Sequence, residues 1–175
     1  QPAGYYRHLN FPQRTYSQDT DDRQWRRGLY VHWQRMFLHP QLLAFDAPTR
    51  EECTAQRSRS NTPKAALVLL NDPTFIEAAR NLAERVLKGS ESDDDRLTPL
   101  WRHAVSRKPD ASERKLLKNL LQNSRQEYQE SPESAAELLA VGISSSDDTL
   151  DAIEHAAWTA TARAVLNLRE TIGRY

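Results

Sequence analysis

Cysteine and glycine are scarce in this chain, and their scarcity excludes several classes of site. One cysteine among 175 residues excludes an internal disulfide, a zinc site built from cysteine pairs and the CxxCH attachment of a c-type haem. The five glycines form no glycine-rich loop of the kind that binds phosphate. No run of about 18 apolar residues occurs, so the sequence predicts no membrane-spanning segment.

An excess of charge of either sign is also absent. Lys and Arg together number 24, as do Asp and Glu, and the pI is near 7.2. We therefore expect no nucleic acid partner, although the balance leaves room for a local basic patch. Hydrophobic residues make up 38% of the chain, and the mean hydropathy is −0.78. Such a polar average favours many charged helix faces, or a surface that meets another domain.

Apolar residues recur at helical spacing through most of the chain, and no segment alternates convincingly with period two. We expect an all-α fold, a single irregular multi-helix bundle in one domain over residues 1–175, with an extended arm at 1–20 and helices within 21–175. The expected helices cover 21–38, a short stretch from 48, 63–70, 72–88, about 95–108, 110–130, 131–139 and about 151–172.

The segment 65–70, AALVLL, is apolar on every side. A helix without a polar face is typical of the buried core, so we expect this helix at the centre of the bundle. Thr62 before Pro63, and Asp72 before Pro73, predict N-caps followed by proline in the first helical turn.

Cys53 is the first candidate for chemistry, because a lone thiol can act as a nucleophile. Glu51 and Glu52 would raise the pKa of the thiol, although Arg50 and Arg57 would oppose them. A buried structural thiol in a short helix is the favoured interpretation.

The histidines are scattered and form no HExxH motif or i, i+4 pair. A surface or capping role is favoured over a metal site, and a haem ligated by Met36 and a histidine is disfavoured. We expect no metal and no cofactor in this chain. The histidines considered are His8, His32, His39, His103 and His155.

The string RSRSNTP carries Arg57, Arg59 and Asn61 just before a predicted helix. Arginine forks beside a helix N-terminus can recognise an anion or a carbonyl group. Alternatively, the arginines tie the loop to the ends of neighbouring helices by binding free carbonyls. The second interpretation is favoured, since no catalytic partner lies nearby in the sequence, and Asp46 and Arg50 are expected in the same network.

The longer string FDAPTREECTAQRSRSNTPKAALVLLNDPTF resembles the signature of a bacterial family of unknown function, one of the so-called planctomycete-specific domains. Upstream YVHWQRMFLHPQLL and the later strings RHAVSRKPDASERKLLKNLL and AAWTATARAVLNLRE resemble the same family, of which this chain looks like the C-terminal part. Family-motif positions singled out as structural or binding residues are Asp46, Arg50, Cys53, Arg57, Arg59, Asn61, Thr62 and Asn71.

The resemblance implies an exported protein, periplasmic or in the cell envelope. Proteins of this family often begin with a planctomycete-type cytochrome c domain and carry a second uncharacterised domain between. Haem is then expected only in the associated cytochrome c domain. The first function hypothesis is a helical accessory or interaction module whose partners are sister domains of the same parent protein. The alternative is part of an enzyme active site formed with an upstream domain, in which Arg57, Arg59 and Asn61 contact an anionic or carbohydrate-like substrate. The sequence leaves the reaction and the substrate open.

Overall fold

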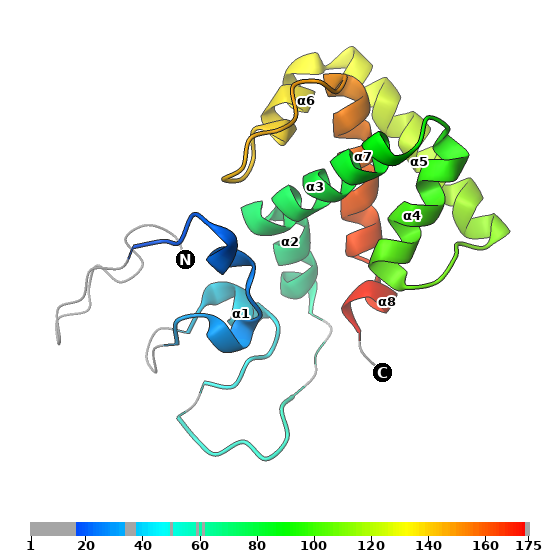
Figure 1. Ribbon diagram of the computed structural model, residues 1–175. Coiled ribbons are helices and arrows are strands. Elements are labelled where there is room, and N and C mark those ends of the chain that lie inside the picture. The colour runs from blue at the N-terminus through cyan, green and yellow to red at the C-terminus, as the bar shows by residue number, and fades with distance from the viewer. Residues whose placement is uncertain (1–16, 34–37, 50, 59, 61, 174–175) are drawn as a thin grey trace. The chain divides into compact units, whose positions relative to one another are not determined.

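The computed structural model describes residues 17–33, 38–49, 51–58, 60 and 62–173, and every regular element in these ranges is a helix (Figure 1). The predicted all-α fold is confirmed. None of the helices formed by these residues is long and apolar enough to span a membrane. The expected arm at 1–20 lies outside the described residues except for 17–20.

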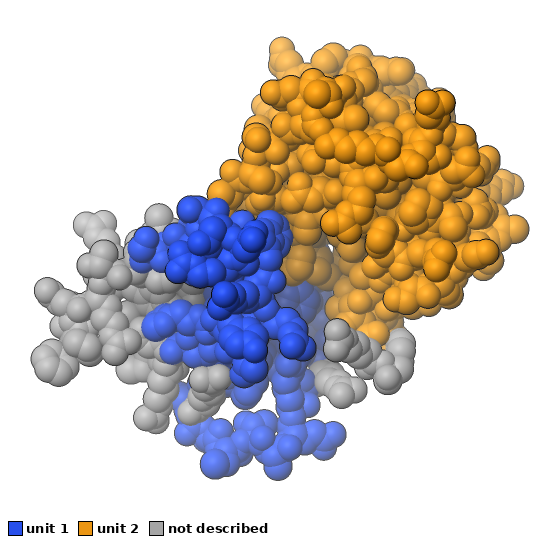
Figure 2. All heavy atoms as spheres, viewed as in Figure 1, with its two compact units in different colours: residues 1–68 blue, residues 69–175 orange. Residues whose placement is uncertain are grey.

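The chain divides into two compact units, unit 1 (Gln1–Val68) and unit 2 (Leu69–Tyr175), which Figure 2 shows in different colours. The expectation of one domain over residues 1–175 stays a prediction.

In unit 1, the prediction of one helix over 21–38 is wrong for the residues that the structure describes. Two short 3₁₀ helices, η1 (Asp22–Trp25) and η2 (Gly28–Tyr30), occupy the first part. Arg26 and Arg27 between them are extended, with ψ near 152°. The carbonyl of Gly28 accepts a hydrogen bond from the indole N–H of Trp33 at 2.9 Å. In an α-helix this carbonyl would accept from a backbone N–H four residues later.

Proline positions explain the next differences. No helix was predicted between 38 and 48, yet Pro40 begins helix α1 (Pro40–Ala44), where His39 is the N-cap and its Nδ1 accepts from the backbone N–H of Gln41 at 3.2 Å. Proline suits the first helical turn because its missing N–H is not needed there. The short helix expected from residue 48 is not formed in the described residues, since 51–52 and 55–56 are bends and 53–54 have no regular structure.

Helix α2 (Pro63–Asn71) begins as predicted, because Oγ1 of Thr62 accepts from the N–H of Ala65 at 3.3 Å. Its expected place at the centre of the core is wrong. None of its residues is buried, and Leu67 is 57% exposed. An apolar composition indicates that a helix can be buried. Burial also requires neighbouring elements that pack over the helix.

The core of unit 2 instead surrounds α7, which packs against α3, α5 and α6 and also contacts α4 and α8 (Figure 1). Ala156, Ala157 and Ala162 of α7 have no exposed surface, nor does Trp158. Small side chains let neighbouring helices approach closely, while the indole fills the space between them. The helices of unit 2 are α3 (Pro73–Gly89), α4 (Asp93–Val105), α5 (Ala111–Glu130), α6 (Pro132–Leu139), α7 (Ala152–Leu166) and α8 (Arg169–Ile172).

The predicted N-cap of α3 is confirmed. Asp72 caps α3 through the N–H of Thr74. Asp110 caps α5 in a reciprocal capping box with Glu113. The last expected helix is interrupted at Asn167, which ends α7 before α8 begins. Leu116 of α5 is 68% exposed, although its neighbour Leu117 is buried.

Candidate functional site

The motif loop of unit 1, residues 46–60, is closed by Asp46 and Ser60. The carboxylate of Asp46 accepts from the backbone N–H of Ser60 at 2.6 Å and from its hydroxyl at 2.7 Å. Asp46 has a positive φ of 58°, a conformation that Asp tolerates better than most residues. The side-chain and backbone hydrogen bonds from Ser60 hold the pKa of Asp46 below its usual value, with help from the charge of Arg57.

Arg57 forms a second hydrogen bond that holds this loop to the end of α1. Its Nη2 donates to the carbonyl of Phe45, the residue that ends α1, at 2.8 Å. This is the arrangement that the structural interpretation of the arginines describes, since a carbonyl at a helix end has no partner within its own helix. Arg57 is exposed, so the contact is open to water.

Cys53 corrects the sequence analysis, because its side chain is exposed and not buried. The expected helix from residue 48 is missing among the described residues, and Cys53 follows a bend at Glu51 and Glu52. Because no helix places this side chain against a core, the thiol is exposed to solvent.

The remaining motif residues divide into two groups. Thr62 caps α2, and Asn71 is the exposed last residue of the same helix. Arg50, Arg59 and Asn61 lie outside the described residues, and their expected role stays a prediction.

A buried polar network in unit 2 holds the segment between α6 and α7 onto α3. Arg80 of α3 has no exposed surface. Its Nη1 donates to the carbonyls of Leu139 at 2.6 Å and Val141 at 2.9 Å, and its Nη2 donates to the carbonyl of Ser144 at 2.6 Å. One guanidinium thus satisfies three carbonyls, one at the last residue of α6 and two in the segment that follows it.

Glu77, one helical turn before Arg80, binds the same segment from its other side. It accepts from the N–H groups of Ile143 at 2.9 Å and Ser144 at 3.0 Å. Burial acts to raise the pKa of Glu77, but these hydrogen bonds and that of the Ser144 hydroxyl outweigh it and keep the pKa below its usual value. Gly142 has φ +114°, and a Cβ there would lie 2.6 Å from the Glu77 carboxylate, so only glycine fits.

His155 of α7 is buried beside this network, which corrects its expected surface or capping role. Its Nε2 lies 3.6 Å from Oε1 of Glu84, and Nε of Arg80 lies 3.9 Å from the same oxygen. Burial lowers the pKa of His155, while the charge of Glu84 partly opposes the shift. In the described part of the chain, no three His, Cys, Asp or Glu side chains gather in a group that could hold a metal ion.

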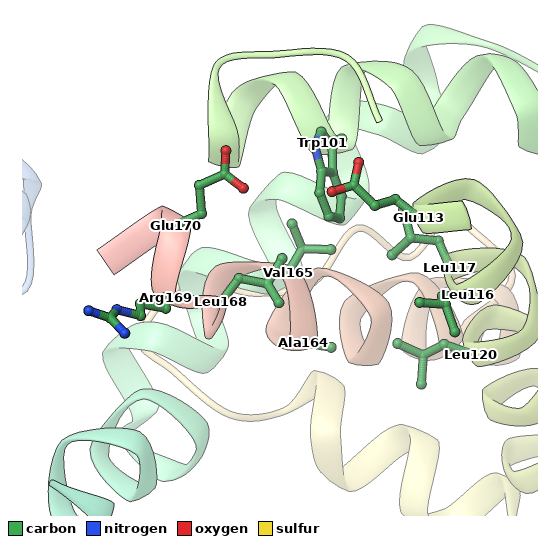
Figure 3. A pocket seen from close by; sticks show the side chains of 10 residues that line it. All are labelled: Trp101, Glu113, Leu116, Leu117, Leu120, Ala164, Val165, Leu168, Arg169 and Glu170. Atoms are coloured by element: carbon green, nitrogen blue, oxygen red, sulfur yellow. The ribbon is translucent and has the colours of Figure 1, made fainter. Parts of the chain in front are cut away.

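Unit 2 also has an apolar groove of about 440 Å³ between α5 and the α7–α8 junction. Figure 3 shows Leu116 and Leu120 of α5 facing Val165 and Leu168 across it, with Trp101 beside Glu113 at one end. The residues that line the groove are Trp101, Glu113, Leu116, Leu117, Leu120, Ala164, Val165, Leu168, Arg169 and Glu170.

The carboxylates of the groove are already paired. Arg107 bonds Glu113 at 2.5 and 2.7 Å and Glu170 at 2.8 Å, and its guanidinium lies 5.3 Å from the centroid of the Trp101 ring. Hydrogen bonds with Glu113 and then Glu170 raise the pKa of Arg107 and lower the pKa of each carboxyl. The groove therefore has apolar walls and a stable ionic cluster at its rim.

Residues 2–121 match the protein family PSD1, described as a protein of unknown function (DUF1553). The match covers more than half of the chain. The chain belongs to this family. No curated protein and no solved structure matches it.

The PSD1 match includes the whole motif loop of unit 1 and ends within α5. The motif-based resemblance to a family of unknown function is thereby confirmed at that level. The buried network was missed by sequence reasoning, although a signal was present. Glu77, Arg80 and Glu84 recur at i, i+3 and i+7 beside the apolar stripe of α3, a spacing that places charged groups at the edge of the buried face.

Proposed function

We propose that this PSD1 chain is an accessory interaction module whose unit 1 is completed by a sister domain of the same exported, cytochrome-linked parent protein. The observation that carries the proposal is the poor burial of apolar side chains in unit 1. Among its described residues only Ala44 is a buried apolar residue, while Leu29 is 77% exposed and Tyr30 63% exposed. Trp25 and Leu43 are exposed as well.

Exposed apolar side chains of this kind favour a covered state. Burying a leucine or a similar side chain stabilises a structure by about 1.5–3 kcal/mol. Tyrosine and tryptophan are enriched at the centres of protein interfaces, because they add apolar area and can still hydrogen bond. A sister domain that covers Trp25, Leu29 and Tyr30 would supply the core that unit 1 lacks.

The partner is assigned from the family resemblance, in which this domain accompanies a cytochrome c domain and a further domain in one exported chain. Such a partner is always present at high effective concentration, since both belong to one polypeptide. The state of the motif loop supports the same assignment. Asp46 and Arg57 bind Ser60 and Phe45 within the loop, which favours a structural role for them over contact with a substrate.

The test compares the isolated chain with the parent protein by hydrogen–deuterium exchange. Backbone amides in η1, η2 and α1 should exchange more slowly in the parent, because the partner covers them. Leu29→Asp should leave the melting temperature of the isolated chain unchanged and should remove this added protection.

Ile172→Asp is the matched control, because Ile172 is an exposed apolar residue of unit 2. It should not alter the protection of unit 1 in the parent. Equal exchange of η1, η2 and α1 in the isolated chain and in the parent would contradict the proposed function.

A further inference from the structure

The groove of unit 2 has a projecting side chain directly beside its hollow. Leu116 is 68% exposed, and it forms one wall of the groove that Leu120 and Leu168 also line. A patch with a knob next to a hole can accept an identical patch, because a two-fold axis places each knob in the hole of the other copy.

The charges around the groove are arranged in the same self-complementary way. Arg107, Glu113 and Glu170 form one cluster with one guanidinium and two carboxylates, which leaves one negative charge in excess. Arg169 is exposed and has no ion pair among the described residues. Figure 3 shows its guanidinium pointing away from the carboxylates of Glu113 and Glu170.

We propose that two copies of this chain associate through the groove between α5 and the α7–α8 junction, with Leu116 of each copy seated in the groove of the other. Arg169 of one copy then faces the Arg107–Glu113–Glu170 cluster of its partner, and the reverse pair forms by symmetry. The inference is independent of the proposed function, since the groove lies wholly on unit 2.

Two general properties suit this association. The net charge of the chain is zero, so long-range repulsion between copies is weak. The groove is lined by ten residues, fewer than the roughly 20–30 residues per partner of a standard interface, so the dimer is weak and dissociates on dilution.

The test is sedimentation velocity on the full chain over a wide range of concentrations. The wild type should shift from monomer to dimer as the concentration rises. Leu116→Glu should weaken dimerisation about tenfold or more, because the carboxylate cannot enter an apolar groove without losing its hydration. Leu67→Glu is the control, since Leu67 is also exposed but lies in α2, and it should leave the dimer unchanged.

A charge exchange tests the orientation. Arg169→Glu and Glu170→Arg should each weaken the homodimer, because each leaves like charges facing across the interface. A mixture of the two variants should form a heterodimer about as tight as the wild type, in which unlike charges face each other once more.

Three results would overturn the proposal: a monomer at every concentration, a dimer that Leu116→Glu leaves intact, or a mixture that does not recover. A monomer whose fluorescence titration shows an apolar dye in the groove, lost in Leu116→Glu, would identify a small apolar molecule as the occupant instead.

Discussion

Unit 1 and unit 2 begin helices with the same local signals but differ in how far those helices extend. Asp21 caps η1, which ends within 4 residues, whereas Asp110 caps α5, which continues for 20. The difference is burial, since α5 places Leu117, Leu121 and Tyr128 in a shared core and η1 buries nothing. A cap begins a helix, but tertiary packing of an apolar face extends and stabilises it.

The difference in burial between the two units is tested most directly by replacing one tryptophan in each unit. Trp158 in α7 has no exposed surface, and its indole N–H donates to Glu154 at 2.8 Å. Trp158→Ala should lower the free energy of unfolding of unit 2 by about 3–5 kcal/mol, because it leaves a cavity. Trp25→Ala, at an exposed position of unit 1, should cost about 1 kcal/mol or less. Denaturant unfolding monitored by circular dichroism measures both, and similar losses would show that unit 1 has a core of its own.

The next largest effect concerns the buried network. Arg80→Met should cost about 3 kcal/mol, since it leaves Glu77 and the carbonyls of the α6–α7 segment without their charged partner. Lys118→Met is the control, because Lys118 pairs with Asp94 in unit 2 at an exposed place. Exposed ion pairs contribute about 1 kcal/mol or less. Denaturation of the two variants gives both values, and equal losses would contradict a special role for the network.

A pH dependence should distinguish unit 2 from unit 1. Burial lowers the pKa of His155 below its ordinary value of 6.5 in the folded chain. The unfolded chain therefore binds the proton more readily, so the stability from neutral His155 is present above pH 6.5 and is lost as the pH falls below it. Glu84 and Arg80 of α3 and Asp147 of the α6–α7 segment act on the same histidine.

Melting temperatures measured between neutral pH and the range where carboxyls begin to titrate will test this prediction. The wild type should lose stability on acidification, and His155→Gln should lose less over the same range. His103→Gln, at an exposed position of α4, should follow the wild type. A wild type whose stability does not change as the pH falls through 6.5 would exclude the effect.

The same contrast shows what the sequence could predict. Caps and helical periodicity predicted the helices of unit 2, because there the local signals and the packing agree. In unit 1 they predicted α2 but failed over 21–33, since Trp25, Leu29 and Trp33 have helical spacing but no core to face in the described residues.

The candidate site was predictable in part. The motif string identified Asp46 and Arg57 as members of one loop, and their hydrogen bonds to Ser60 and Phe45 close it. Exposure could not be predicted from the string, because the burial of Cys53 depends on distant elements that the string does not specify. Glu77 and His155 were missed for the related reason that a charged or titratable residue is usually assigned to the surface.

The smallest expected effect is in the motif loop of unit 1. Arg57→Ala removes the 2.8 Å hydrogen bond to the carbonyl of Phe45. Because the group is exposed, water can replace the lost donor, and the loss of stability should be about 0.5 kcal/mol or less.

Arg27→Ala, at another exposed arginine of unit 1 without a side-chain cap bond, is the control and should have no measurable effect. The melting temperature of Arg57→Ala should therefore be only slightly lower than that of Arg27→Ala. A loss as large as that of Arg80→Met would mean that the loop is buried by a partner or by a second copy, since only removal from water makes such a donor irreplaceable.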